Sequence, residues 1–129
     1  MSSSIFPSDF LDLFQQLLSF TVKELELCPW MKSQTFTSML DELQSELEEV
    51  KAASSSHALA CELGDLFRDA VLLLSLAARD GLLSSSSLPL REILTKIRRR
   101  KPWVEQGQSV SFEEACRIWD EVKSQENCT

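Results

Sequence analysis

The stretch MLDELQSELEEVKAASSSHALACELGDLFRDAVLLLSLAARDG, residues 39–81, determines the fold class of this chain. In each half, apolar residues recur at intervals of three and four, the spacing of one face of an α-helix. Three serines at 54–56 separate the halves, and Gly81 suits the position just after a helix end. The stretch predicts helices over about 35–53 and about 57–80, which pack as antiparallel neighbours because their connection is short. The second helix is apolar around most of its later half, so we expect it to be the most buried.

The segments on either side of this pair also have helical patterns. One apolar pattern covers about 10–27, with Ser8 as a candidate N-cap. A second runs over about 89–100, with a proline in its first turn. A third covers about 112–125 and follows a capping-box pattern that begins at Ser111. The chain therefore predicts helices along most of its length.

The amino-acid composition and the positions of two prolines support an all-α fold. The chain has 3 glycines and no tyrosine, which disfavours a sheet protein. Pro29 and Pro102 are expected to end the helices that precede them. The 129 residues suit one domain. We predict a compact bundle of four to five helices in a single domain over 1–129, with 1–7 and 127–129 as flexible ends.

The bulk properties exclude several classes of protein. A net charge of −7 argues against general nucleic-acid binding, which needs a basic surface. The 4 cysteines form no C-x-x-C pair and the only histidine is His57, so neither a zinc site nor a disulfide framework is indicated. Residues 1–8 lack the pattern of a signal peptide, and the longest apolar stretch, 70–78, is too short to cross a bilayer. We expect a cytoplasmic protein that binds no nucleic acid and no membrane.

Two pairs of acids stand out on the two central helices. The first is Glu46-x-x-Glu49 and the second is Glu62-x-x-Asp65. Residues three apart on a helix project from nearly the same face, so each pair can direct two carboxylates at one point. Antiparallel packing would bring all four together. Ligands that are all oxygen favour Mg²⁺, with Mn²⁺ as a substitute, over zinc.

The second pair belongs to a longer stripe. Glu62, Asp65 and Asp69 follow one another at helical spacing, and the stripe continues into Leu72 and Leu76. A solvated helix face seldom continues into an apolar stripe, so these acids are expected to be partly buried. Partly buried carboxylates need a positive charge nearby. In a chain with 20 acidic residues, solvated helix faces are the alternative, and the acidic pattern alone leaves both interpretations open.

Several segments, in order, give the chain a resemblance to the MazG family of nucleoside triphosphate pyrophosphohydrolases. It covers roughly 10–126. The matching residues are Cys28-Pro29-Trp30, Gln34-Thr35, the E-x-x-E pair, Glu62-Leu63-Gly64-Asp65-Leu66, Lys96, Arg99-Arg100, Pro102, Val104, Glu113-Glu114-Ala115, Trp119 and Lys123. Two positions depart from the family pattern: Ser45 replaces an additional glutamate and Met31 replaces an aspartate.

The resemblance implies Mg²⁺-dependent hydrolysis of a nucleoside triphosphate to a monophosphate and pyrophosphate. It assigns metal binding to the four acids Glu46, Glu49, Glu62 and Asp65. It assigns nucleotide contacts to Lys96, Arg100, Trp119 and Lys123. Among the acids, Glu49 is our candidate for taking a proton from the attacking water. Asp69 and Arg99 are candidates for indirect support, Asp69 through a metal-bound water.

The resemblance leaves the physiological role open. Removal of unwanted nucleotides from the cellular pool is the expected purpose. A dedicated dUTP, dCTP or phosphoribosyl-ATP pyrophosphohydrolase is one alternative, and a non-catalytic helical interaction protein is another. A homodimer or homotetramer is expected, mainly on the basis of the family.

Overall fold

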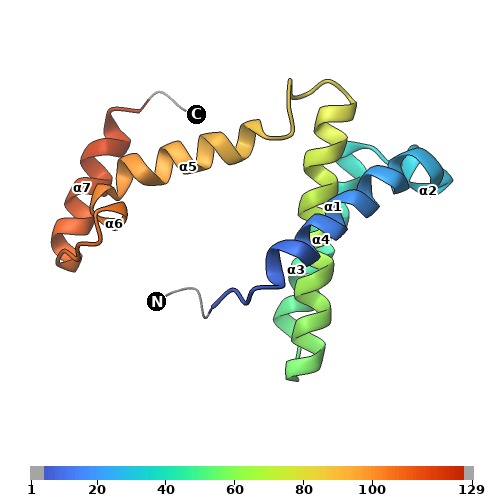
Figure 1. The fold of residues 1–129 in the computed structure, drawn as a ribbon, viewed down its shortest axis with the longest axis horizontal. Helices are drawn as coiled ribbons and strands as arrows, with labels where there is room; N and C mark the ends of the chain where they lie inside the picture. The colour runs from blue at the N-terminus through green and yellow to red at the C-terminus, as the bar shows by residue number, and fades with distance from the viewer. Residues whose placement is uncertain (1–4, 127–129) are drawn as a thin grey trace. The chain divides into compact units, whose positions relative to one another are not determined.

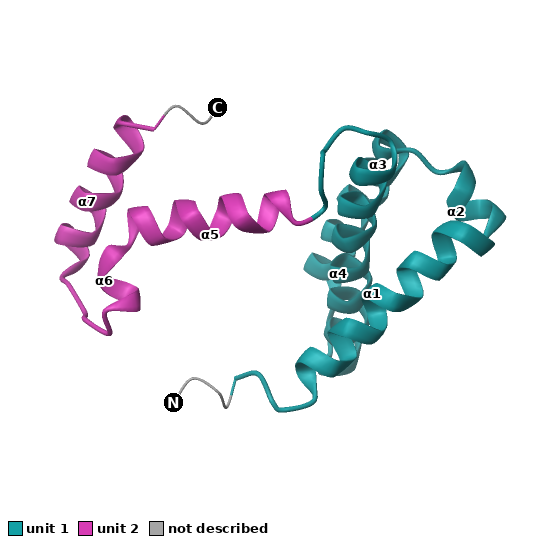
Figure 2. Ribbon diagram, turned by 45° about the horizontal axis from the view of Figure 1, so that its top comes forward, with its two compact units in different colours: residues 1–86 teal, residues 87–129 magenta. Residues whose placement is uncertain are grey.

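The computed structural model describes residues 5–126, and within them all regular secondary structure is helical (Figure 1). Two compact units are present, residues 1–86 and residues 87–129 (Figure 2). The first unit contains α1 (Phe10–Leu27), α2 (Pro29–Ser33), α3 (Phe36–Ala52) and α4 (Ser56–Arg79). The second contains α5 (Leu88–Arg100), α6 (Pro102–Glu105) and α7 (Phe112–Ser124).

The prediction of an all-α fold is confirmed, and each of the five expected helices is present. The short helices α2 and α6 were not predicted. Pro29 and Pro102 each follow the end of one helix and form the first residue of the next. Proline suits that first position because it has no N–H to leave unpaired there and its φ is already helical. Of the ends expected to be flexible, 1–4 and 127–129 lie outside the described residues.

One helix start differs from the prediction and one agrees. Ser8 is not the N-cap of α1: Asp9 occupies that position, and its side chain makes no capping hydrogen bond. Ser111 does cap α7, because its hydroxyl accepts a hydrogen bond from the Glu114 N–H at 3.1 Å. The predicted capping box is only half formed, since the Glu114 carboxylate accepts a hydrogen bond from Arg117 instead of reaching back to the start of the helix.

The core of the first unit lies where α4 meets α2 and α3. Its buried cluster is made of Met31, Met39, Leu72 and Leu76. α4 contributes more buried residues than any other described helix, as the sequence predicted. Burial of this apolar stripe is what holds α4 at the centre of the unit.

Polar contacts fasten the first two helices to α4. Arg68 on α4 donates to Glu24 on α1, with 2.5 Å between Nη2 and Oε2. Arg79, at the end of α4, donates to the backbone oxygens of Gln34, at 2.7 Å, and Met31, at 3.4 Å. These bonds fix the segment from which α3 begins.

The second unit is built on contacts of α5 with α6 and α7. Glu126, just after α7, forms ion pairs with two arginines of α5: 2.7 Å to Arg99 and 2.5 Å to Arg100. Arg98 pairs with Glu105 of α6 at 2.9 Å. Among the described residues, no helix is long and apolar enough to cross a lipid bilayer.

Candidate metal centre

Local sequence signals set the positions of α3 and α4. Thr35 begins α3 through a reciprocal capping box with Ser38, in which both hydrogen bonds measure 3.0 Å. Ser55 begins α4 by accepting a hydrogen bond from the Ala58 N–H at 3.0 Å. Only residues 53–55 connect the two helices, so the chain turns back and α3 lies alongside α4 (Figure 2).

The four acids predicted to meet do lie together in the first unit. Glu46, Glu49, Glu62 and Asp65 each offer one carboxylate oxygen, and these four oxygens all lie within 4.8 Å of one another. Glu46 and Glu62 are half-buried, whereas Glu49 and Asp65 are exposed. The spacing of three within each helix, combined with the short connection, therefore produces one cluster of carboxylates.

The electrostatics of the cluster show that it lacks positive charge. Burial, together with repulsion from Glu49, raises the pKa of Glu46 to about 7. The pKa of Glu62 is also raised, first by its hydrogen bond to Glu49 and then by burial. Carboxyl groups this close cannot all ionise at neutral pH unless a cation compensates them.

Two oxygens of the cluster have unsatisfied bonding capacity. Oε2 of Glu46 and Oε2 of Glu62 are buried and have no hydrogen-bond partner among the described residues. A buried carboxylate oxygen without a partner is costly, and a bound cation would remove that cost. The donor set contains only oxygen, which fits Mg²⁺ or Mn²⁺.

Asp69 lies one turn beyond the cluster on α4. Asp69 is buried, with 7% of the residue exposed. Its Oδ2 also has no hydrogen-bond partner among the described residues. Burial and repulsion from Glu42 and Asp65 raise its pKa. Further along the same stripe of α4, Leu72 and Leu76 are fully buried, as the sequence predicted.

The predicted nucleotide contacts all lie in the second unit, on α5 and α7. Arg100 and Trp119 are in contact there, with the guanidinium carbon 4.8 Å from the indole centroid. Lys96 is half-buried on α5, and Lys123 is exposed on α7. A cation over an aromatic face, flanked by further basic residues, suits binding of an anionic ligand that carries a ring.

Glu126 is a residue of this region that the sequence did not reveal. Its carboxylate accepts hydrogen bonds from Arg99 and Arg100, and these contacts lower its pKa to about 2. The partners lie 26 and 27 residues earlier in the chain, so no local spacing indicates the contact. The two arginines therefore already hold an anionic group.

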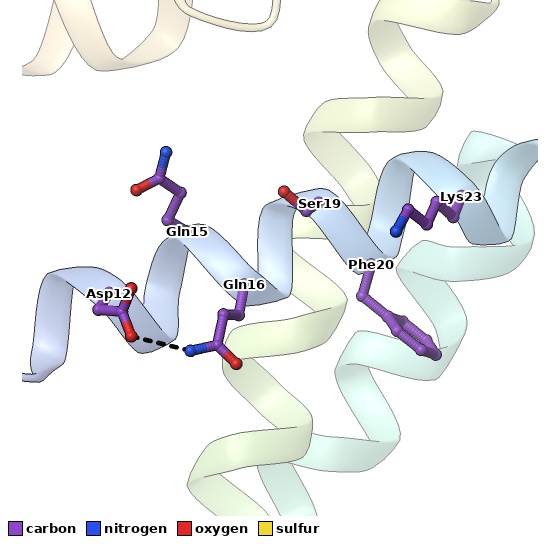
Figure 3. A pocket seen from close by; sticks show the side chains of 6 residues that line it. All are labelled: Asp12, Gln15, Gln16, Ser19, Phe20 and Lys23. Carbon is purple, nitrogen blue, oxygen red and sulfur yellow. Dashed lines mark hydrogen bonds between the residues drawn. The ribbon is translucent and has the colours of Figure 1, made fainter.

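A shallow hollow on α1 is separate from the carboxylate cluster. Figure 3 shows its side chains projecting from α1, with Gln16 donating to Asp12 at 2.9 Å. The lining residues all come from α1: Asp12, Gln15, Gln16, Ser19, Phe20 and Lys23. None of the four clustered acids is among them, so the candidate metal centre does not depend on this hollow.

Comparison with known families gives a match over more than half of the chain. The model of the MazG nucleotide pyrophosphohydrolase domain matches residues 34–105. This range contains the whole of α3 and α4, with the four clustered acids, and also Lys96, Arg99 and Arg100. Trp119 and Lys123 lie beyond it.

Comparison with solved structures gives a consistent result. A crystal structure of a MazG-related protein from Thermotoga maritima is similar to this chain, with 34% sequence identity and a TM-score of 0.81. The similarity covers 85% of this chain and 98% of that one. No match was found among curated protein sequences. The family match and the similarity in sequence and fold show that the chain belongs to the MazG nucleotide pyrophosphohydrolase family.

Proposed function

We propose that this protein hydrolyses nucleoside triphosphates to monophosphates and pyrophosphate with the help of Mg²⁺. The observation that carries the proposal is the cluster of four carboxylates between α3 and α4, with its two unpartnered buried oxygens. The cluster lies inside the segment that matches the family model. These carboxylates need a bound cation, and bound magnesium would in turn allow the negatively charged triphosphate to approach them.

Each acid has a proposed task that follows from its burial. Glu46 and Glu62, half-buried and with an unpartnered oxygen each, would hold the metal together with Asp65 and Glu49. Magnesium bound there would neutralise phosphate charge and activate a water molecule for attack. Glu49 is exposed to solvent, so it is our candidate for the group that accepts the proton of that water.

The basic residues of the second unit are proposed to bind the nucleotide. Lys96 and Arg100 are four residues apart on α5, so both side chains can reach one chain of phosphates. Arg100 would exchange its bond to Glu126 for a phosphate oxygen, which is also an anionic acceptor. Trp119 would stack on the base or sugar, with Lys123 one turn further along α7.

We further propose a homodimer or homotetramer that removes unwanted nucleotides from the cellular pool. Large apolar side chains of α1 are exposed in the single chain, including Leu11 at 75% and Leu27 at 75%. Apolar surface of this kind favours association with a second copy. Sedimentation analysis of the purified chain would show a single monomeric species if this proposal is wrong.

The enzymatic proposal is tested with the full chain, Mg²⁺ and a panel of substrates. The panel contains canonical, deoxy and oxidised nucleoside triphosphates, with dUTP, dCTP and phosphoribosyl-ATP included. Monophosphate and pyrophosphate should appear in equal amounts, and one preferred substrate would identify a dedicated enzyme. Orthophosphate as the product would reject this class of reaction.

Two variants make the test specific to the cluster. Glu62→Ala removes a half-buried acid of the cluster and should abolish pyrophosphate release. Glu48→Ala removes an exposed neighbour that pairs with Lys51 at 3.4 Å, and should leave the rate within about twofold of the parent. Should neither nucleotide nor Mg²⁺ bind to the parent chain in calorimetry, a non-catalytic interaction protein becomes the better interpretation.

A further inference from the structure

The second unit contains a hollow formed by α6, α7 and the residue that joins α5 to α6. Its volume is about 350 Å³, within the range of pockets that hold small molecules. Both α6 and α7 pack against α5, so the walls of the hollow are held by the same helix. The lining residues are Lys101, Trp103, Ala115, Cys116, Trp119 and Asp120.

Two indole rings form the large apolar surfaces of this hollow. Trp103 comes from α6 and Trp119 from α7, and both side chains are half-buried, so part of each remains accessible. Ala115 and Cys116 add only small side chains on the α7 side. An indole offers a flat surface on which a planar heterocycle can stack, and every nucleobase has such a ring. The hollow therefore suits a nucleobase.

Positive charge lies beside the same aromatic surface. The guanidinium carbon of Arg100 is 4.8 Å, and the ammonium nitrogen of Lys101 is 5.5 Å, from the centroid of the Trp119 ring. Lys101 also lines the hollow. A ring held in the hollow can therefore carry a phosphate group that reaches a cation. A nucleotide has both of these features, whereas a purely apolar ligand has only the first.

Asp120 supplies the carboxylate of the hollow. It is exposed on α7, and among the described residues its side chain forms no ion pair and no hydrogen bond. An ionised carboxylate has two oxygens that only accept hydrogen bonds. Guanine presents a ring N–H and an amino group side by side, so it offers a donor to each oxygen. Adenine and cytosine have an acceptor beside their amino group, and uracil and thymine have a carbonyl on each side of the ring N–H. The carboxylate therefore favours guanine.

We propose that this hollow is a guanine-selective base site, in which the base stacks on Trp103 and Trp119 and donates hydrogen bonds to both carboxylate oxygens of Asp120. This inference rests on the proposed function, which makes a nucleotide the substrate, and it narrows that substrate to guanine nucleoside triphosphates. Trp103 and Asp120 determine specificity, because they contact the base and not the reacting phosphates.

Calorimetry of the full chain with nucleoside monophosphates, in the presence of EDTA, tests the base site without any bound metal. The parent chain should bind GMP at least about tenfold more tightly than IMP, which lacks only the amino group next to the ring N–H. AMP should bind no better than IMP. Equal affinities for the three nucleotides, or no saturable binding of GMP, would overturn the inference.

Asp120→Asn should change the order of preference, which a merely structural role would not do. An amide pairs one acceptor with one donor, so it matches xanthine, in which a carbonyl oxygen replaces the amino group of guanine. The variant should therefore bind XMP more tightly than GMP, the reverse of the parent. Glu121→Gln is the matched control: it removes the next carboxylate, which pairs with Arg117 at 2.8 Å, and should keep GMP affinity within about twofold. An unchanged order in Asp120→Asn contradicts the assignment.

Trp103 should affect all bases alike, because stacking does not depend on the hydrogen-bonding groups of the base. Trp103→Ala should weaken binding of GMP, IMP and AMP at least about fivefold each and by similar factors. Trp103→Phe keeps an aromatic ring at this half-buried position and should bind GMP within about threefold of the parent. Undiminished binding of GMP by Trp103→Ala removes this residue from the site.

Pyrophosphate release measured with Mg²⁺ on the same preparations separates this inference from the proposed function. Equal turnover of GTP, ITP and ATP, with equal affinities for the monophosphates, would remove the guanine site and leave the proposed function standing. Guanine-selective binding without turnover of any triphosphate would do the opposite, since the enzymatic proposal would fail while the base site remained.

Discussion

Glu46 shows how one side chain couples the candidate metal centre to pH. Its carboxyl is half-buried beside three other acids, and its pKa is about 7. Near neutral pH this carboxyl is therefore partly protonated. A divalent cation bound by the same oxygens has to displace that proton.

Metal affinity should consequently depend on pH in the range of the Glu46 pKa. Lowering the pH from about 8 to about 6 should weaken Mn²⁺ binding roughly tenfold, because one more proton must be released. Calorimetry in buffers with different ionisation enthalpies measures both the affinity and the protons released. In Glu46→Gln the remaining dependence on pH should be clearly smaller. A parent affinity that is the same at both pH values would show that Glu46 does not contact the ion.

Leu76 tests the core on which the position of α4 depends. Its side chain is fully buried among Met31, Met39 and Leu72. Leu76→Ala should lower the free energy of unfolding by about 2–5 kcal/mol, since it loses burial and leaves a cavity. Leu82→Ala, at a residue that is 61% exposed, should change it by less than about 0.5 kcal/mol. Urea denaturation measures both, and equal effects would argue against this core.

The start of α3 is the local feature that sets the direction of the acid-bearing helix. The Thr35 hydroxyl accepts a hydrogen bond from the Ser38 N–H, and the Thr35 N–H donates the reciprocal bond to the Ser38 hydroxyl. Thr35→Ala should destabilise the first unit by about 1 kcal/mol. Ser8→Ala is the matched control: Asp9, not Ser8, stands at the start of α1, so no comparable loss is expected. Thermal unfolding measures both variants. A larger fall in melting temperature for Ser8→Ala than for Thr35→Ala would contradict the role given to Thr35.

Glu126 connects α5 to the end of α7, and its effect on stability has a defined pH range. Arg100 and Arg99 lower its pKa from the ordinary 4.5 to about 2. The folded state therefore favours the ionised form. The stabilisation is fully present above about pH 4.5 and is lost as the pH falls towards about 2.

Removal of this carboxylate should reduce that acid-sensitive part of stability. The parent chain should lose melting temperature between about pH 4.5 and pH 2 more steeply than Glu126→Gln. The same substitution should lower the KM for nucleotide, because Arg99 and Arg100 are no longer occupied. Parallel melting curves for the two proteins across this range would contradict the role given to Glu126.

At the scale of elements, sequence patterns predicted the long helices and missed the short ones. Helices of 13 residues or more repeat their apolar spacing several times, whereas α2 has 5 residues and α6 has 4. Those segments are too short to show a period. A proline that ends one helix can also begin the next, as Pro29 and Pro102 do here. The same limitation applies to the start of α1, where a serine next to the helix suggested a cap that it does not form.

At the scale of the whole chain, the predicted site residues divide between the two units. The four acids were predicted to meet from spacing and from a short connection, both local properties, and their oxygens do lie together. The nucleotide contacts came from the family resemblance, and their role stays a prediction. Contacts between distant segments, such as Arg68 with Glu24 and Arg100 with Glu126, have no local signature and were not foreseen.

Binding of a divalent cation by the carboxylates between α3 and α4 is the property on which the proposed activity depends. Crystals of the full chain grown with Mn²⁺ test it directly, because manganese is located by its anomalous scattering. We predict a strong anomalous peak in contact with oxygens of Glu46, Glu49, Glu62 and Asp65. Absence of a peak at saturating Mn²⁺, with the four side chains directed into solvent, would contradict it.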